Sequence, residues 1–183
     1  MDLKKISVTM SYILRHGAIK MGVPITKDGY IKLSTLAETV AAMHAGVTEE
    51  HIRQIVAEDK KGRYTITTDQ DIRANQGHSM ELDIQFQKLV PPAVLYHGTA
   101  TKNALSIGQS GIESRARHHV HLSDNAATAW EVGARHGTPM ILVIDAMAMW
   151  TDGIDFFLSE NGVWLTAAVD PKYITDMQFS LEQ

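Results

Sequence analysis

Two stretches in the first half of the chain combine arginine or histidine with other polar side chains in a way that suits an anionic ligand. Arg15 and His16 are adjacent, so a permanent cation stands beside an imidazole that titrates near neutral pH, a pair that suits a phosphate. The segment 72–79, IRANQGHS, gathers Arg, Asn, Gln, His and Ser around one glycine. Both stretches also have a structural interpretation, in which Arg15 caps its own helix and 72–79 is an exposed hairpin strand running into a loop.

Three motifs in the second half have similar chemistry. Residues 96–99, YHGT, follow an apolar stretch and precede a predicted helix, a position that favours anionic or nucleotide ligands, although a threonine helix cap is the alternative. No GxGxxG or GxxxxGK[ST] pattern accompanies them, so neither a Rossmann nor a P-loop site is predicted. Residues 118–121, HHVH, lack a carboxylate at metal-ligand spacing, which favours a strand that lines a ligand over a metal site. Residues 135–137, RHG, close a predicted helix, where a cation complements the helix dipole.

The elements that position the first two motifs are predicted from hydrophobic periodicity. Apolar residues at helical spacing predict helices over residues 3–15, 34–45 and 48–60, and Thr35 with Glu38 resembles a capping box. After the third helix, apolar and polar residues alternate, which predicts a hairpin. In this hairpin Ile72 and Ala74 face the core, while Arg73 and Asn75 face the other way. Three helices followed by a hairpin is the pattern of a winged helix.

The second half predicts a different architecture. Strands are predicted at 94–96, 119–122, 140–145 and 162–166, and helices at 102–109 and 124–136. The pair Pro91-Pro92 favours a boundary. We therefore expect an α+β protein with a winged-helix lobe over residues 1–85, a linker over 86–93 and a mixed α/β lobe over 94–183.

Composition limits the class of protein. The chain has 183 residues, 44% of them apolar, a net charge of −4 and no cysteine, so it is predicted to be a soluble globular protein without disulfides, thiolate nucleophiles or cysteine-ligated metals. Residues 1–85 carry eleven basic and eleven acidic side chains, whereas 86–183 carry six and ten. The longest apolar run, 140–150, contains Asp145 and is too short to cross a bilayer, and no signal peptide is apparent. We expect a cytoplasmic protein with no membrane partner.

The ordered motifs closely resemble the RNA 2'-phosphotransferase family, called KptA in bacteria and Tpt1 in fungi. The motifs that carry this resemblance are LRH (14–16), IRANQGHS (72–79), LYHGT (95–99), RHHVHLS (117–123), GARHG (133–137) and NGVWLT (161–166). The resemblance implies a winged-helix lobe on the RNA side and an ADP-ribosyltransferase-like lobe that binds NAD as a consumed co-substrate. It implies that an internal 2'-phosphate of RNA, as at a tRNA splice junction, attacks the nicotinamide ribose. The resulting 2'-phospho-ADP-ribosylated RNA then resolves into 2'-OH RNA and ADP-ribose 1'',2''-cyclic phosphate, without a metal.

The resemblance also implies roles for individual residues. The family's catalytic group corresponds to Arg15, His16, Arg73 and Arg135. Arg15 and Arg73 would hold the 2'-phosphate, His16 would contact it and assist the second step, and Arg135 would stabilise charge and orient the ribose. The implied RNA-side residues are Asn75, Gln76, His78 and Ser79, and the implied NAD-binding residues are His97, Gly98, Thr99, Arg117, His121, Leu122 and Ser123.

Two other functions stay open at this point. One is an ADP-ribosyltransferase that caps phosphate termini of RNA or DNA and stops after the first step. The other is a winged-helix nucleic-acid-binding module that senses NAD. The zero net charge of residues 1–85 argues against this module, because nucleic-acid binding usually relies on a basic face. In each case we expect a monomer.

Overall fold

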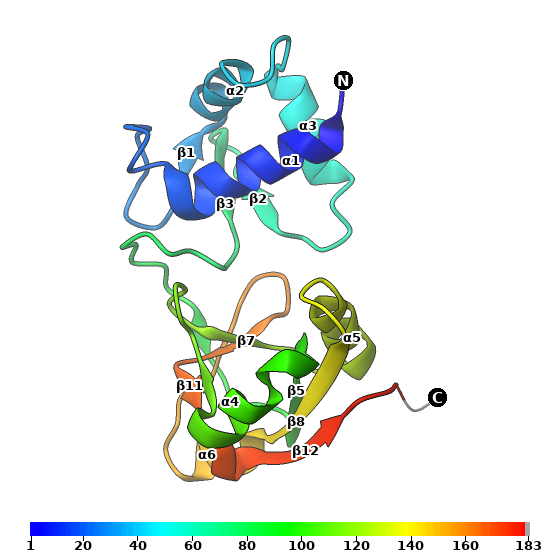
Figure 1. The fold of residues 1–183 in the computed structure, drawn as a ribbon. Coiled ribbons are helices and arrows are strands. Elements are labelled where there is room, and N and C mark those ends of the chain that lie inside the picture. The colour runs from blue at the N-terminus through cyan, green and yellow to red at the C-terminus, as the bar shows by residue number, and fades with distance from the viewer. Residues whose placement is uncertain (182–183) are drawn as a thin grey trace. The chain divides into compact units, whose positions relative to one another are not determined.

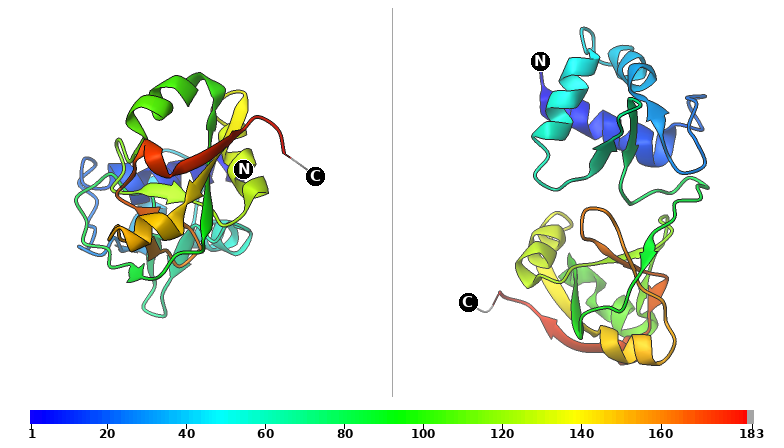
Figure 2. Two further views of the ribbon diagram at one scale, coloured as in Figure 1. Left: turned by 90° about the horizontal axis from the view of Figure 1, so that it is seen from below. Right: turned by 180° about the vertical axis from the view of Figure 1, so that it is seen from behind.

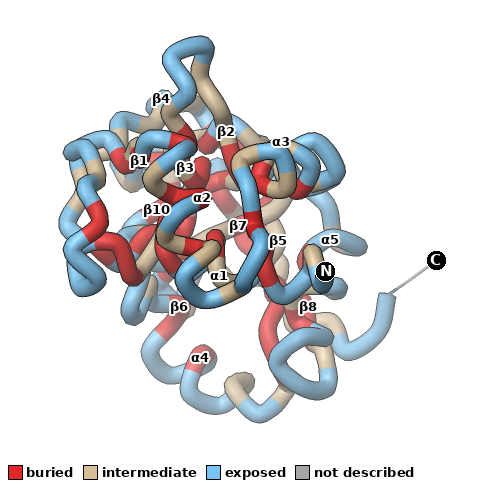
Figure 3. The backbone as a smooth tube through the Cα atoms, turned by 90° about the horizontal axis from the view of Figure 1, so that it is seen from above, coloured by how far each residue is buried: buried red, intermediate tan, exposed pale blue. Residues whose placement is uncertain are grey.

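The chain folds into two compact units, Met1–Gln85 and Phe86–Gln183 (Figures 1 and 2). The structure is a computed structural model that describes residues 1–181. Each unit has its own core of buried aliphatic and aromatic side chains, and the buried segments are red in Figure 3. The described residues form six α-helices and several antiparallel sheets, so the prediction of an α+β protein is confirmed at this level.

The first unit contains three α-helices: α1 (Leu3–Tyr12), α2 (Leu33–Ala41) and α3 (Glu49–Ala57). The first was predicted to run on as an α-helix to residue 15, but it widens into a π-helical turn at Ile13–Gly17. The Tyr12 ring lies close over Gly17, where a Cβ would lie 2.6 Å from the ring. The absence of a side chain thus lets the aromatic ring cover the turn.

The predicted capping box at Thr35 and Glu38 is wrong. The short strand β1 (Ile31–Lys32) leads directly into α2, so this helix begins at Leu33 without a side-chain cap, and Thr35 already lies within it. A capping box does form at the start of α3. There the ring of His51 accepts a hydrogen bond from the Thr48 backbone N–H at 3.2 Å, so a histidine takes the place usually held by Glu or Gln.

The predicted hairpin of the first unit is confirmed. Strand β2 (Tyr64–Ile66) pairs antiparallel with β3 (Asp71–Ala74), and β1 pairs with the other edge of β3. Ile72 and Ala74 are fully buried, whereas Arg73 lies opposite Thr65 on the other face. Strand alternation therefore directs the Arg73 guanidinium away from the hydrophobic core.

The second unit contains two larger sheets and one smaller strand pair. A three-stranded sheet has the order β12 (Ile174–Gln178), β8 (Pro139–Asp145), β5 (Val94–Ala100), and a four-stranded sheet has the order β4 (Gln87–Lys88), β9 (Phe157–Leu158), β10 (Trp164–Thr166), β7 (Val120–Leu122). Strands β6 (Ile112–Glu113) and β11 (Ala168–Val169) form the small pair. The helices are α4 (Ala104–Ser110), α5 (Ala126–Ala134) and α6 (Ala146–Thr151), with 3₁₀ turns at Thr101–Asn103 and Pro171–Tyr173.

Two glycines bring α5 close to β5. A Cβ at Gly98 would lie 1.6 Å from the carbonyl oxygen of Ala129, and a Cβ at Gly133 would lie 2.6 Å from that of Thr99. Backbone therefore packs on backbone where helix and strand meet. This contact fixes the C-terminal end of α5, where Arg135 is the C-cap residue.

Candidate active site

The π-helical turn places Arg15 and His16 at the end of the first helix. The Arg15 Nη1 donates a hydrogen bond to the hydroxyl of Ser11, one turn earlier, at 2.9 Å. His16 Nδ1 lies 2.8 Å from the hydroxyl of Ser79, and the Ser79 backbone N–H donates to the Arg15 carbonyl at 3.0 Å. The loop after β3 is thus tied to the turn through both of its candidate catalytic residues.

Arg73 belongs to the same region of the first unit, because β3 contacts the π-helical turn. Its guanidinium carbon lies 4.7 Å from the centre of the Tyr30 ring, which is a cation–π distance, and its Nη1 reaches the carbonyl of Asp28 at 3.5 Å. The first unit therefore brings together Arg15, His16 and Arg73. Guanidinium and imidazole groups are side chains of the kind that bind phosphates, and here they lie on neighbouring elements.

The four residues predicted to face RNA lie in different environments. Asn75 and His78 are each only 5% exposed, Gln76 is half-buried and Ser79 is exposed. The Asn75 side chain donates to the Gly62 carbonyl at 2.8 Å and accepts from Thr65 at 2.8 Å. Within this structure the Asn75 amide thus holds the base of the hairpin together.

Basic side chains gather in the second unit around His97. A backbone bridge between Tyr96 and Ser123 aligns β5 with the end of β7, and His97 Nδ1 donates to the His121 carbonyl at 3.0 Å. The Arg117 Nη1 in turn donates to His121 Nδ1 at 3.1 Å. These contacts link three of the residues predicted to bind NAD.

The electrostatics of this cluster favour a neutral His97. Burial lowers the pKa of His97, its hydrogen bond to the His121 carbonyl opposes that shift, and the positive charges of His136 and Arg117 lower the pKa further. Burial also lowers the pKa of the Arg117 guanidinium, which nevertheless stays charged at neutral pH. Arg117 therefore supplies the lasting positive charge of this cluster, and such a charge suits an anion.

The other residues predicted to bind NAD have roles in the fold as well. Gly98 allows the close approach of α5, and the hydroxyl of the buried Thr99 accepts a hydrogen bond from Asn103 at 3.0 Å. Leu122 is buried. The Ser123 hydroxyl accepts from the Asn125 backbone N–H at 3.1 Å, just before α5.

Arg135 lies in the second unit. It is the C-cap residue of α5, is exposed, and donates its backbone N–H to the Val132 carbonyl at 3.2 Å. Helix α5 begins after Asn125, whose side chain caps it, so it is shorter at both ends than the predicted span 124–136.

The histidines at 118–121 do not share one environment. His119 packs edge-on between Phe86 and Phe157, with ring centroids 5.8 and 5.9 Å away, and burial together with the charge of His118 lowers its pKa. Within residues 1–181 no group of three or more histidines and carboxylates is arranged to hold a metal ion. In the same part of the chain no helix has the length and apolar character needed to span a bilayer.

Comparison with known proteins then identifies the family. The model of the RNA 2'-phosphotransferase family, Tpt1/KptA, matches residues 2–168. The chain belongs to the Tpt1/KptA family. A probable RNA 2'-phosphotransferase of Nostoc punctiforme is 42% identical over 173 residues, which is 94% of this chain and 96% of that protein. Proteins with the same description from Acaryochloris marina and Burkholderia pseudomallei are 41% and 42% identical and cover 97% and 90% of this chain, and 98% and 90% of their own lengths.

Membership in the Tpt1/KptA family confirms the predicted resemblance and places the chain among transferase enzymes. The matched region contains all six motifs that carried the resemblance and each of the four predicted catalytic positions.

Sequence reasoning missed three side chains that contact or act on the candidate residues. Ser11 precedes Arg15 by four residues on a helix, so helical spacing alone could have indicated it. Tyr30 gave no such signal, and His136 lies in the RHG motif but was not connected with His97. Tyr30 lies far from Arg73 in sequence, and His136 acts on His97 only through the fold.

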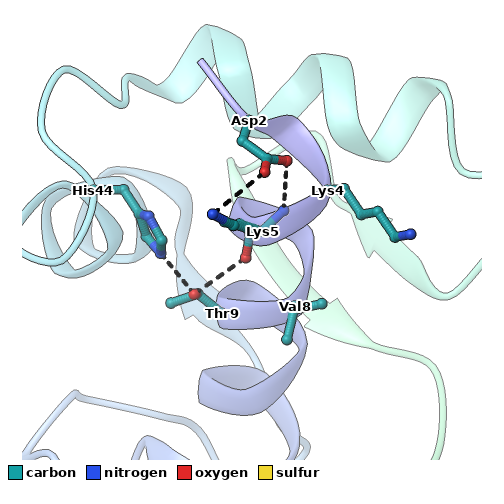
Figure 4. Close-up of a pocket in the computed structure, with 6 residues that line it drawn as sticks. All are labelled: Asp2, Lys4, Lys5, Val8, Thr9 and His44. Carbon is teal, nitrogen blue, oxygen red and sulfur yellow. Dashed lines mark hydrogen bonds and ion pairs between the residues drawn. The ribbon is translucent and has the colours of Figure 1, made fainter.

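An open pocket lies elsewhere on the first unit (Figure 4). It has a volume of about 490 Å³ and is lined by Asp2, Lys4, Lys5, Val8, Thr9 and His44. His44 Nε2 lies 2.8 Å from the Thr9 hydroxyl, which also donates to the Lys5 carbonyl at 3.2 Å. These contacts hold the segment after α2 against α1, and none of the candidate residues described above lines this pocket.

Proposed function

We propose that the protein is an NAD-dependent RNA 2'-phosphotransferase that removes an internal 2'-phosphate from RNA, of the kind left at a tRNA splice junction. A 2'-phosphate oxygen attacks the anomeric carbon of the nicotinamide ribose and nicotinamide leaves. The ribose 2''-hydroxyl then attacks the bridging phosphorus, which releases RNA with a 2'-hydroxyl and ADP-ribose 1'',2''-cyclic phosphate. Family membership supports the transferase activity, and the side chains of the two units support the details.

The observation that carries this proposal is the set of Arg15, His16 and Arg73 in the first unit. The π-helical turn and the adjoining strand β3 hold these side chains. Each of the two guanidinium groups can bind two phosphate oxygens. We assign Arg15 and Arg73 to the 2'-phosphate of RNA, and His16 to contact with that phosphate during the second step.

The basic cluster of the second unit fits NAD as the co-substrate. Bound NAD would supply the ADP-ribose that accepts the phosphate and the nicotinamide that leaves. His97 does not gain a proton readily, because burial lowers its pKa, so its Nε2 is available as a hydrogen-bond acceptor, while Arg117 provides a positive charge suited to the pyrophosphate. Arg135 is assigned to the charge that develops during transfer.

We also propose that residues 1–85 are a winged-helix lobe on the RNA side and residues 94–183 an ADP-ribosyltransferase-like lobe, joined through 86–93. The three helices and the antiparallel hairpin of the first unit support the first assignment. The sheets of the second unit and its basic cluster support the second.

The test mixes the full chain with a short RNA that carries one internal 2'-phosphate, with and without NAD, in the presence of a chelator. Mass spectrometry follows the RNA and the nucleotide products. We expect loss of phosphate from the RNA together with ADP-ribose cyclic phosphate only when NAD is present. Accumulated ADP-ribosylated RNA would instead indicate a transferase that stops after the first step. RNA binding without either product would indicate a binding module.

Matched variants test the assigned residues in the same assay. Arg15→Ala and Arg73→Ala should each lower turnover by about 100-fold or more, since each removes a charged phosphate contact. Arg53→Ala is the control, because Arg53 lies on α3 beside Glu49 and has no assigned role. Equal activity of all three variants would contradict the assignment.

A further inference from the structure

Ser79 makes two separate contacts with the π-helical turn. Its backbone N–H donates to the carbonyl of Arg15 at 3.0 Å, and its hydroxyl lies 2.8 Å from Nδ1 of His16. One residue therefore contacts the main chain of one candidate catalytic residue and the side chain of the next. His16 and Ser79 are 63 positions apart in sequence, so this is a tertiary contact.

The local backbone explains how Ser79 reaches this position. The π-helical turn uses hydrogen bonds over five residues, as in the 3.0 Å bond from the Ala18 N–H to the Ile13 carbonyl, and the Arg15 carbonyl accepts from Ser79. After β3 the chain turns at Gly77, whose φ of 90° lies in the region that glycine adopts without strain. The turn thus directs the following residues toward the end of the first helix.

We propose that Ser79 is a positioning residue for His16. The inference deepens the proposed function and rests on it, since it concerns the imidazole that we assign to the phosphate. With Nδ1 bonded to the Ser79 hydroxyl, the imidazole meets the phosphate through Nε2. A hydroxyl can donate to Nδ1 of the neutral ring or accept from the Nδ1–H of the charged ring, so Ser79 holds the same ring orientation in both protonation states.

This role differs from the RNA contact that the family resemblance implies for Ser79. A hydroxyl that binds RNA directly contributes to RNA affinity, so its loss raises KM. A hydroxyl that orients His16 contributes to the chemical step, so its loss lowers kcat. The two roles therefore predict different kinetic changes.

The kinetic test compares Ser79→Ala, Ser79→Thr and the control Ser34→Ala in the full chain. Ser34 is an exposed serine on α2 of the same unit. Ser79→Ala should lower kcat by about 10- to 100-fold, the loss typical of a misplaced catalytic group, with KM for RNA almost unchanged. Ser79→Thr keeps a hydroxyl and should recover most of the rate, whereas Ser34→Ala should behave as the original chain.

The spectroscopic test needs no substrate. Imidazole ¹⁵N spectra are recorded across a pH titration, and the His16 signals are assigned as those lost in His16→Gln. Ser79→Ala should shift the His16 Nδ1 signal and change its titration, Ser79→Thr should restore both, and Ser34→Ala should change neither. This readout stays valid if the original chain proves inactive on 2'-phosphorylated RNA, so failure of the proposed function is recognised separately.

Three results would overturn the inference. The first is an unchanged His16 titration in Ser79→Ala. The second is a higher KM for RNA at constant kcat, which would make Ser79 an RNA contact. The third is an equal loss in Ser79→Thr and Ser79→Ala while both variants keep the circular dichroism of the original chain, because a hydroxyl would then not be the cause.

Discussion

At the scale of single residues, neighbouring side chains orient the two arginines that we assign to the phosphate. Arg73 lies over the ring of Tyr30, and Arg15 donates to Ser11. A guanidinium that is already oriented loses less conformational entropy when it binds a phosphate. The sequence indicated Arg15 and Arg73 as candidates because their motifs are distinctive, whereas the Tyr30 contact joins two distant segments and exists only in the folded chain.

Replacement of Tyr30 tests this orientation. Tyr30→Leu removes the aromatic face beneath Arg73, and because a cation–π contact is worth about 0.5–2 kcal/mol, kcat/KM for RNA should fall by about 2- to 30-fold. Tyr30→Phe keeps the ring and serves as the control, with activity close to that of the original chain. An equal loss of activity in both variants would show that the Tyr30 ring does not orient Arg73.

His97 gives a prediction about pH. Its pKa in the folded chain lies below the ordinary value of about 6.5, so the unfolded chain takes up a proton at higher pH than the folded chain does. The second unit should therefore keep its full stability above that ordinary value and lose stability as the pH falls below it. His119, whose pKa is also lowered, adds to the same trend.

Hydrogen exchange of the amides in β5 and β8 measures this effect in the second unit alone. Between about pH 7.5 and 5.5, a range that brackets the ordinary histidine pKa, protection corrected for the intrinsic exchange rate should fall less in His97→Asn than in the original chain. The reason is that Asn can still donate to the His121 carbonyl but does not titrate. An identical pH dependence in the two proteins would show that His97 is not responsible.

At the scale of elements, local patterns were predictable and long-range contacts were not. The β2–β3 hairpin was correctly predicted because alternation and a polar turn are encoded within one short segment. The π-helical turn was not predicted, and one of its carbonyls, that of Arg15, accepts from the distant Ser79, a contact that no local pattern shows. The hydrogen bonds that the buried Asn75 makes with Gly62 and Thr65 were likewise not predicted.

The contact between α5 and β5 gives a prediction about stability. Gly98→Ala would put a methyl group 1.6 Å from the Ala129 carbonyl oxygen, so helix and strand must separate. Overpacking of this kind costs about 1–3 kcal/mol or more, and this position should fall at the upper end because the neighbour is rigid backbone. Urea denaturation should show the loss as a lower midpoint.

Gly108→Ala is the matched control for that variant. Gly108 lies in α4, and the place that an alanine methyl group would take there is open space. Alanine should therefore be neutral or stabilise the chain by about 0.5–1 kcal/mol, because alanine has a higher helix propensity than glycine. Equal denaturation midpoints for the two alanine variants would contradict the close packing of α5 on β5.

At the scale of the whole molecule, the net charge alone does not indicate which ligands the protein binds. The net charge of −4 would disfavour a nucleic-acid partner, yet the arginines and histidines described above lie at particular positions in each unit. The family and its enzyme class could be predicted because six motifs occur in order over most of the chain. The contacts that hold the candidate residues in place could not, since they join segments far apart in the sequence.

The central claim is that the phosphate itself moves from RNA to the ADP-ribose of NAD. An RNA with an ¹⁸O-labelled internal 2'-phosphate tests it most directly when all products of the full chain are followed by mass spectrometry. We predict that the labelled phosphate appears in ADP-ribose 1'',2''-cyclic phosphate, with one nicotinamide released for each phosphate transferred. Labelled inorganic phosphate formed without NAD, or label that stays on the RNA while NAD is consumed, would contradict the account.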